Sequence, residues 1–251
     1  VNTEIGIRLS NDMALGETDF ELMGMSGNNV KILLDGIPLI DRGATKQSLS
    51  QLDVNSIERV EIVEGPMSVV YGTDALAGVI NIITKKGDGY SEENTWRVGA
   101  RVQEESMGKE YDFFKDKGLH NESIDLGFNH KSGLFVNGGY TRNNHGGWQG
   151  DLTGREKRWH PKDQALMNGM FGFQNRNMNV WYRLDFLDEK IFGPNNGSEL
   201  QPEKVSDKDF LTKRYTHQLQ SDWKLDNRLD VHAALSYQDY SMMEYLQYLT
   251  Q

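Results

Sequence analysis

The stretch LSQLDVNSIERVEIVEGPMSVVYGTDALAGVINIITKK, residues 49–86, decides how the N-terminal part of this chain folds. It predicts two β-strands, IERVEIVEG and GVINIITKK, because β-branched residues dominate both and Gly-Pro and Tyr-Gly pairs separate them. Upstream, VKILL and IPLI flank Asp35-Gly36, a pair that favours a tight hairpin turn since both positions tolerate positive φ. Pro38 cannot donate to a ladder, so it is expected on an edge strand. Together these segments predict a compact α/β piece.

A different pattern follows KKGDGYSEE, which interrupts the apolar sequence with charge and glycine and predicts a linker. Seven later segments alternate apolar and polar residues with period two, as strands with one apolar face do. Short connections at residues 131–133, 175–177 and 225–227 alternate with long polar loops at about 106–121, 144–163 and 189–212. This asymmetry is typical of transmembrane β-barrels. A soluble antiparallel sandwich is the alternative, because its strands alternate too.

The barrel interpretation has two consequences. Seven strands with two open edges cannot sit in lipid, where each unpaired backbone group costs several kcal/mol, so the segment is expected to be a piece of a longer chain. Aromatic residues near strand ends are expected in interfacial girdles. The candidates are Trp96, Tyr140, Trp181 and Trp223.

Composition and motifs exclude several functions. The net charge of −10 argues against nucleic acid as a partner, and the absence of cysteine removes disulfides and thiolate metal sites. No apolar run approaches the ~18 residues of a spanning helix. There is no G-x-S-x-G, H-E-x-x-H or phosphate-loop motif, so no enzyme, metal site or cofactor is predicted.

Residues 28–43, NNVKILLDGIPLIDRG, together with residues 49–86 resemble the plug domain of TonB-dependent outer-membrane receptors. The resemblance implies a small α/β plug domain with a mixed sheet, followed by antiparallel transmembrane β-barrel strands. The chain would be a fragment of a plugged outer-membrane barrel of about 22 strands. The expected division is the C-terminal part of the plug domain at residues 1–88, a linker at 89–94 and the first seven barrel strands at 95–251.

Two departures from the family pattern concern arginines. Leu22-Met23-Gly24 stands where the family often has Ile-Arg-Gly, and Glu64-Gly65-Pro66 where it often has Arg-Gly-Pro. Contacts made by those arginines are expected to be lost or replaced in this chain.

The resemblance also implies a function and partners. The expectation is a receptor in the Gram-negative outer membrane that imports a scarce nutrient, most simply a ferric siderophore or haem, with cobalamin, glycan or peptide as alternatives. The implied partners are outer-membrane lipids and the TonB energy-coupling protein, which grips a TonB box absent from this segment. Whether an accessory surface lipoprotein is a further partner is left open. Alternatives from other classes are a soluble β-sandwich adhesion module and a surface enzyme.

Three groups of residues are the candidate sites. By the resemblance, the outward loops of the plug form the floor of the ligand site; the candidates are Asn11, Asp12, Met13, Leu15, Asp41, Arg42, Thr45 and Gln47. In the second long loop, imidazole and indole groups could cover a flat iron-bearing ligand, with a bystander role as the alternative; these are His145, Trp148, Trp159 and His160. Charged contacts between plug and barrel wall, or otherwise a solvated strand face, are expected at Glu58, Arg59, Glu61, Glu64, Arg97, Arg101 and Arg183.

Overall fold

The computed structural model describes residues 7–12, 17–22, 24–25, 29–39, 48–65, 75–86, 93–152, 155, 157–194, 205–226 and 228–249. Contacts divide the chain into two units. One contains Val1–Lys85 with Gln149–His160, and the other contains Lys86–Trp148 with Pro161–Gln251. Most of the expected linker at residues 89–94 lies outside the described residues, and the expected domain boundaries stay predictions.

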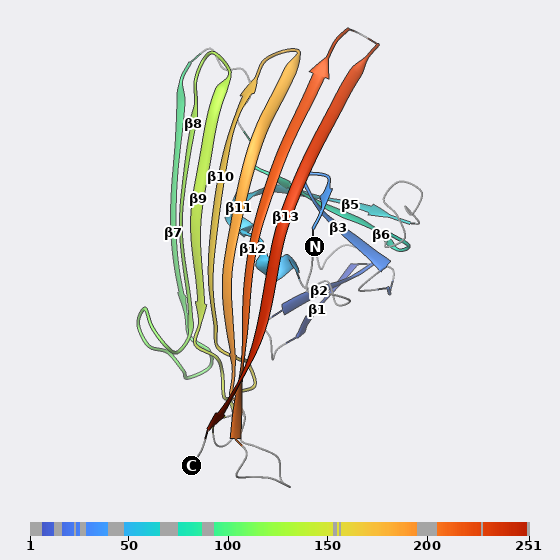
Figure 1. Cartoon of the computed structure of the whole chain (residues 1–251). Helices are drawn as coiled ribbons and strands as arrows, with labels where there is room; N and C mark the ends of the chain where they lie inside the picture. Colours follow the sequence, from blue (N-terminus) through green and yellow to red (C-terminus); the bar gives the residue numbers. More distant parts are fainter. Residues whose placement is uncertain are drawn as a thin grey trace. The chain divides into compact units, whose positions relative to one another are not determined.

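The N-terminal unit contains a mixed sheet of four strands in the order β4-β3-β6-β5, as predicted. Strands β3 and β6 pair in parallel, while β4 and β5 pair antiparallel to their neighbours (Figure 1). The strands are β3 (Val30–Leu34), β4 (Ile37–Pro38), β5 (Ile57–Glu64) and β6 (Gly78–Thr84). A separate hairpin joins β1 (Ile7–Asp12) to β2 (Glu17–Leu22). The helical part of the described residues consists of two 3-10 helices, η2 (Ser48–Gln51) and η3 (Val54–Ser56).

The predicted hairpin turn ties two strands of this sheet together. Asp35 and Gly36 both have positive φ, 50° and 83°, and Pro38 lies on the edge strand β4 as expected. The Asp35 carboxylate is buried and accepts hydrogen bonds from the backbone N–H of Thr84 at 3.1 Å and from its hydroxyl at 2.7 Å. Through these two hydrogen bonds, the Asp35 carboxylate links the end of β3 to the end of β6.

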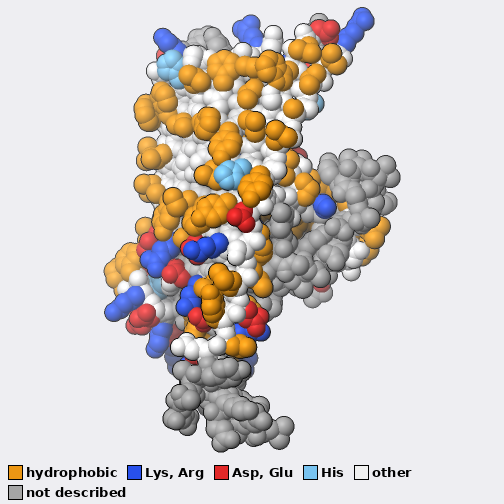
Figure 2. All heavy atoms as spheres, in the orientation of Figure 1, with side chains coloured by type: hydrophobic (Ala, Val, Ile, Leu, Met, Phe, Trp, Pro, Cys, Tyr) orange, Lys and Arg blue, Asp and Glu red, His pale blue; other side chains and the backbone are white. Residues whose placement is uncertain are grey.

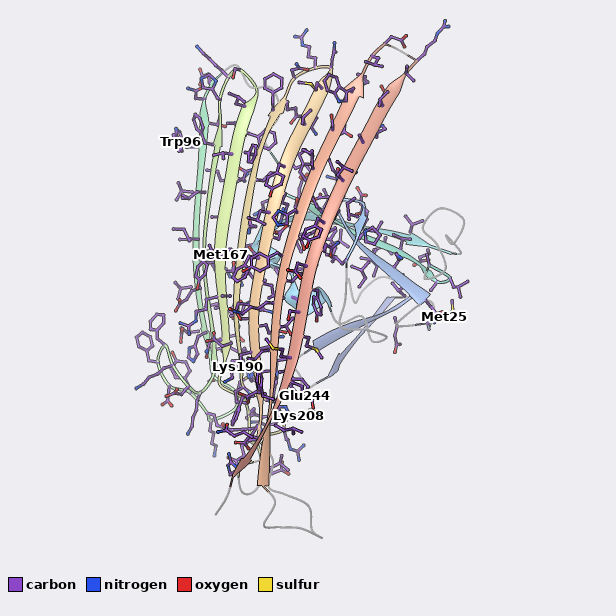
Figure 3. All side chains as sticks on the ribbon, viewed as in Figure 1. Met25, Trp96, Met167, Lys190, Lys208 and Glu244 are labelled. Atoms are coloured by element: carbon purple, nitrogen blue, oxygen red, sulfur yellow. The ribbon has the colours of Figure 1, made fainter. Side chains whose placement is uncertain are left out.

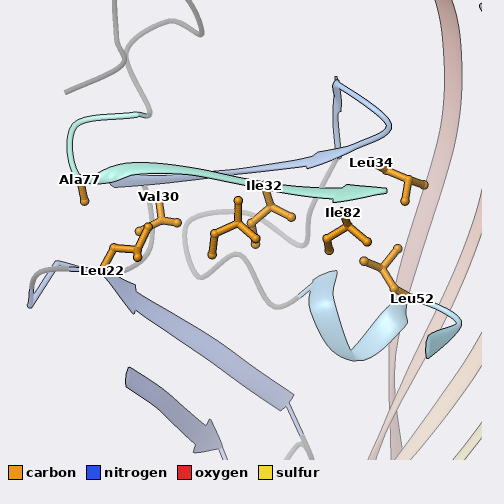
Figure 4. Packing of buried hydrophobic residues seen from close by; sticks show 8 residues of the cluster. Leu22, Val30, Ile32, Leu34, Leu52, Ala77 and Ile82 are labelled. Atoms are coloured by element: carbon orange, nitrogen blue, oxygen red, sulfur yellow. The ribbon is translucent and has the colours of Figure 1, made fainter. Parts of the chain in front are cut away.

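The core of this unit lies on one face of the sheet (Figure 4). Ile32 pairs with Ile80 and Leu34 with Ile82, so the alternating residues of β3 and β6 meet. Full burial of one such side chain contributes about 1.5–3 kcal/mol. The cluster comprises Leu22, Val30, Ile32, Leu34, Leu52, Ala77, Ile80 and Ile82. A smaller cluster of Leu33, Ala75 and Val79 lies apart from it, which explains why these strands are almost continuously apolar.

The second unit is a single antiparallel sheet in which each strand pairs with the next along the chain (Figure 1). All seven predicted strands are confirmed: β7 (Thr95–Glu105), β8 (Leu119–Asn129), β9 (Leu134–His145), β10 (Lys162–Gln174), β11 (Met178–Gly193), β12 (Val205–Lys224) and β13 (Asp230–Leu249). Because they form one sheet rather than two stacked sheets, the sandwich alternative loses its basis. Among the described residues no helix is long and apolar enough to cross a membrane.

One face of this sheet, called here the outward face, is apolar and exposed. Trp96 is 76% exposed, Val98 70% and Leu235 70%. Figure 2 shows the apolar side chains as a broad surface over the strands, with most charged side chains gathered toward one end. The exposed residues of this face are Trp96, Val98, Val102, Ile124, Leu126, Leu134, Val136, Tyr140, Met167, Phe171, Leu184, Tyr215, Leu219, Trp223, Val231, Leu235 and Tyr237.

The apolar band is slightly shorter than the ~25 Å that is usual for the apolar band of a transmembrane barrel. Along β12 it runs from Trp223 to Tyr215, which is ~27 Å of strand at about 3.4 Å per residue, or ~21 Å along the membrane normal at a tilt of about 40°. Beyond it the outward face carries ion pairs, such as Arg142–Asp163 at 3.2 Å. In Figure 3, Trp96 and Met167 lie in the apolar part, whereas Lys190 lies toward the long connections.

The expectation that Trp181 belongs to an interfacial aromatic girdle is wrong. Trp181 is 1% exposed and packs with Phe135 and Met170 on the opposite face, called here the inward face. Its neighbours Val180 and Tyr182 alternate with it, and Tyr182 pairs with the exposed Leu219, so Trp181 has the wrong parity to face lipid.

A glycine makes room for this aromatic cluster. Gly172 pairs with Phe135 on one side and with Trp181 on the other. A Cβ at Gly172 would lie 2.5 Å from the Val180 carbonyl oxygen, 2.6 Å from Phe135 Cζ and 2.8 Å from Trp181 Cβ. The rings therefore close over the backbone of β10 only because no side chain projects there.

Candidate functional site

The inward face of β9, β10 and β11 carries a buried hydrogen-bonded network. Gln164 accepts a hydrogen bond from Asn143 Nδ2 at 2.8 Å and donates one from its own Nε2 to Glu189 Oε2 at 2.8 Å. Lys162 Nζ lies 3.0 Å from the same oxygen, and the Glu189 side chain is 0% exposed. Each group thus offsets the desolvation of the next, as a buried carboxylate requires.

Arg183 occupies the middle of the inward face, as its alternation predicted. Its Nε and Nη2 donate to the two carboxylate oxygens of Asp185 at 2.7 and 2.6 Å, a bidentate fork. The Arg183 side chain is only 4% exposed. Arg214 and Gln218 are buried on the same face of the neighbouring strand β12. This part of the wall can hold anionic or hydrogen-bonding groups in fixed positions.

Arg97 and Arg101 lie on the same face of β7. Arg97 Nη2 donates to Asn137 Oδ1 at 3.3 Å, reaching across Gly127, where a Cβ would lie 2.7 Å from that oxygen. Arg101 Nη2 donates to Gln103 Oε1 at 2.6 Å. Contacts of the three inward arginines with a plug stay predictions.

The charges of β5 pair with one another. Arg59 donates from Nε to Glu61 Oε1 at 2.9 Å and lies 3.1 Å from Glu58 Oε1 through Nη1. The hydrogen bond to Glu61 and the nearby negative charge raise the pKa of Arg59. Glu64 is exposed. The β5 face is thus a charged, hydrated surface, and its expected contact with a barrel wall stays a prediction.

The expected plug loops fall largely outside the described residues. Asn11 and Asp12 are an exception and a correction: they belong to β1, paired with Thr18 and Glu17, so the expected loop is shorter than residues 11–17. Backbone pairing in the hairpin continues through these polar residues. The candidates Met13, Leu15, Asp41, Arg42, Thr45 and Gln47 lie outside the described residues.

The candidate haem-covering residues are not assigned to one site. His145 ends β9, is buried, and accepts a hydrogen bond at Nδ1 from the backbone N–H of Gly147 at 2.9 Å. That nitrogen is therefore engaged and not available to iron. His145 and Trp148 belong to the second unit, whereas Trp159 and His160 group with the first. Within the described part of the chain, no three His, Cys, Asp or Glu residues form a metal-binding group.

One cluster was missed by the sequence analysis because it assigned residues 106–121 to a loop. His120 lies in β8, and its Nδ1 is 2.6 Å from Glu104 Oε2. Tyr111 donates its hydroxyl to that oxygen at 3.0 Å, and burial together with the Glu104 carboxylate raises the pKa of Tyr111. The available signal was parity, since Glu104 continues the alternation of Trp96 and Val98.

Comparison with known proteins finds relatives of the N-terminal part of this chain. The family model for the TonB-dependent Receptor Plug Domain matches residues 1–79. The chain is 33% identical over 103 residues to the Ferrienterobactin receptor of Escherichia coli, a match covering 36% of this chain and 14% of that receptor. It is 40% identical over 79 residues to the Vitamin B12 transporter BtuB of Vibrio vulnificus, covering 32% of this chain and 13% of that transporter.

The fold extends the likeness beyond the plug. The solved structure of the copper transporter OprC superposes with a TM-score of 0.65 at 12% identity, over 97% of this chain and 44% of that one. The chain thus spans less than half of that structure, and the curated matches cover only 13–14% of their proteins. Residues 1–79 thus carry the plug domain of the TonB-dependent receptors, and the strands that follow have the fold of the barrel wall in the solved transporter.

Proposed function

We propose that this receptor binds and imports a scarce nutrient as an anionic iron complex, either a ferric siderophore or haem. The plug sequence supports import by a receptor of this family, since its relatives include a ferrienterobactin receptor and a vitamin B12 transporter. Cobalamin is therefore the second candidate, and glycan or peptide import the third. The relatives are receptors and transporters rather than enzymes.

The observation that carries the preference for an anionic complex is the chemistry of the inward face. Four arginines lie on it: Arg97 and Arg183 within the height of the apolar band, and Arg101 and Arg214 one residue beyond its last apolar row. Guanidinium groups bind planar oxygen anions through two donors and stay charged at every physiological pH. Cobalamin, which lacks comparable carboxylates or catecholates, would use these groups less.

We further propose that the ligand contacts the plug through the candidate loop residues, Asp41, Arg42, Thr45 and Gln47 among them, and that TonB supplies the energy. The exposed ion pairs of β5 support a plug that moves, because hydrated charge pairs contribute little stability and re-form easily. Deletion of TonB in the host should then abolish uptake while leaving ligand binding to the receptor unchanged.

The test is a tryptophan-fluorescence titration of the receptor in detergent with haemin, cobalamin and a panel of ferric siderophores, each beside its metal-free form. The expected result is saturable submicromolar quenching by one iron complex, weakened by Arg183→Met. Binding of cobalamin alone would overturn the iron assignment. No binding across the panel would shift the assignment to a glycan or peptide.

A further inference from the structure

The connection between β7 and β8, residues 106–118, packs against the outward wall of the sheet. Glu104 and His120 share the parity of the exposed Trp96 and so belong to the outward face. Two groups of the connection contact Glu104 Oε2: the Tyr111 hydroxyl at 3.0 Å and the Phe114 backbone N–H at 3.4 Å. Figure 1 shows this connection projecting sideways where β7 ends.

The connection is held in a defined conformation. Phe114 and Asp116 have positive φ, 57° and 61°, a region that costs a residue with a Cβ about 1–2 kcal/mol. Met107 and Glu110 form a β-bridge, and the Gly118 carbonyl accepts a hydrogen bond from the Gly146 N–H at 3.0 Å. Such a conformation persists only where surrounding contacts determine it.

This defined conformation exposes two aromatic rings. Phe113 is 69% exposed and Phe114 48%, and the two rings lie edge to face with centroids 4.4 Å apart. Lys115 follows directly and Lys117 two residues later, and both are exposed, as is Asp116 between them. An ordered pair of exposed phenylalanines beside lysines is unexplained in water, where apolar exposure is unfavourable, and is typical of a segment that meets a lipid headgroup layer.

The height of the connection agrees with that layer. The last row of the outward face that is apolar from β7 to β12 contains Ala100 and Ile124, and Glu104 lies four residues further along β7. Four residues are ~14 Å of strand, or ~10 Å along the membrane normal at a tilt of about 40°. The headgroup region adds about 5–8 Å to each side of the hydrocarbon core. Since the apolar band of ~21 Å falls about 2 Å short at each end of the ~25 Å that is usual for transmembrane barrels, Glu104 lies ~8 Å beyond the hydrocarbon, at the outer edge of the headgroup layer.

We propose that residues 106–118 anchor the receptor to the outer leaflet of the membrane. Phe113 and Phe114 enter the headgroup layer, and Lys115 and Lys117 bind the phosphates of the lipids. The partner is a phosphate-bearing membrane lipid. The Glu104–His120–Tyr111 cluster positions the loop by holding it against the wall.

The absence of cysteine from this chain gives a direct test. A single Phe113→Cys substitution, in a receptor without other cysteines, is labelled with an environment-sensitive fluorophore and reconstituted in vesicles. Val98→Cys on the apolar band is the lipid-facing control, and Arg101→Cys on the inward face is the water-facing control. The label at 113 is expected to show blue-shifted emission and quenching by lipids labelled near the headgroup, as at 98 and unlike at 101.

The lipid phosphates are tested in the same system. Emission at 113 is compared in phosphatidylcholine vesicles and in vesicles that also contain phosphatidylglycerol, with and without Lys115→Gln and Lys117→Gln. We expect a larger blue shift of the label in the anionic vesicles, and we expect the double substitution to remove this difference. Quenching by aqueous iodide at 113 equal to that at 101 would overturn the anchor. Identical emission in both vesicle types would overturn the role of the lysines.

Discussion

Replacing Gly172 by alanine tests whether the packing of Phe135 over Trp181 stabilises the barrel wall. The added Cβ would meet three atoms at 2.5, 2.6 and 2.8 Å, one of them the backbone carbonyl oxygen of Val180. Ordinary contacts begin near 3.4 Å, so the neighbours must move by up to 0.9 Å (3.4 − 2.5), in a ladder that cannot yield easily. Overpacking of this kind costs about 1–3 kcal/mol.

Gly169 in the same strand is the matched control. It lies on the outward face, and a Cβ there would have no atom within 4 Å. Both substitutions remove the same backbone entropy from the unfolded chain, a gain of about 0.5–1 kcal/mol, so this contribution cancels when the two variants are compared. The free energy of unfolding of the Gly172→Ala variant should therefore be lower than that of the Gly169→Ala variant by about 1–3 kcal/mol.

The assay is urea unfolding of the receptor in detergent, followed by tryptophan fluorescence, with the midpoint and the slope measured for each variant. Equal slopes with a lower midpoint for Gly172→Ala are expected. If the two variants unfold within about 0.5 kcal/mol of each other, the close packing across Gly172 contributes nothing and the reasoning is refuted.

Three further predictions concern hydrogen-bonded polar groups. Asp35→Ala should lower the unfolding free energy of the plug by about 1–3 kcal/mol, since it leaves the buried Thr84 donors unpaired, and hydrogen exchange at the Thr84 amide should increase. Glu189→Ala should cost about 3–5 kcal/mol because it removes the buried carboxylate that Lys162 and Gln164 both contact, whereas Lys162→Met with Glu189→Gln should recover most of it in urea unfolding. The raised pKa of Tyr111 means that its contribution to loop stability is complete below its ordinary value of 10.0 and is lost as the pH rises through the folded value. Alkaline titration of tyrosinate absorbance should accordingly show one late-titrating group that Tyr111→Phe removes.

The strands were predictable, and their ends were not, for a single physical reason. Period-two alternation identifies a strand only while its two faces meet different solvents. Beyond Tyr215 the outward face of β12 carries Lys213, so both faces are polar and the pattern disappears although the ladder continues to Val205. The sequence analysis therefore assigned Glu189 to a loop, and the network around it could not be predicted. His120 was missed for the same reason.

The pairing register of the strands decides at once which side chains face outward and which face inward. A slip of one residue in β11 would move Arg183 and Asp185 into lipid and bring Val180 and Tyr182 to the inward face, because side chains alternate strictly. The hydrogen bond from Gln164 to Glu189 and the ring of Trp181 over Gly172 each require the observed pairing with β10. The apolar band alone leaves register less well defined, since Val, Leu, Phe and Tyr are nearly interchangeable in lipid. The polar and aromatic contacts of the inward face therefore specify which residues of each strand face the membrane, and substitutions there should disturb insertion even where no lipid is touched.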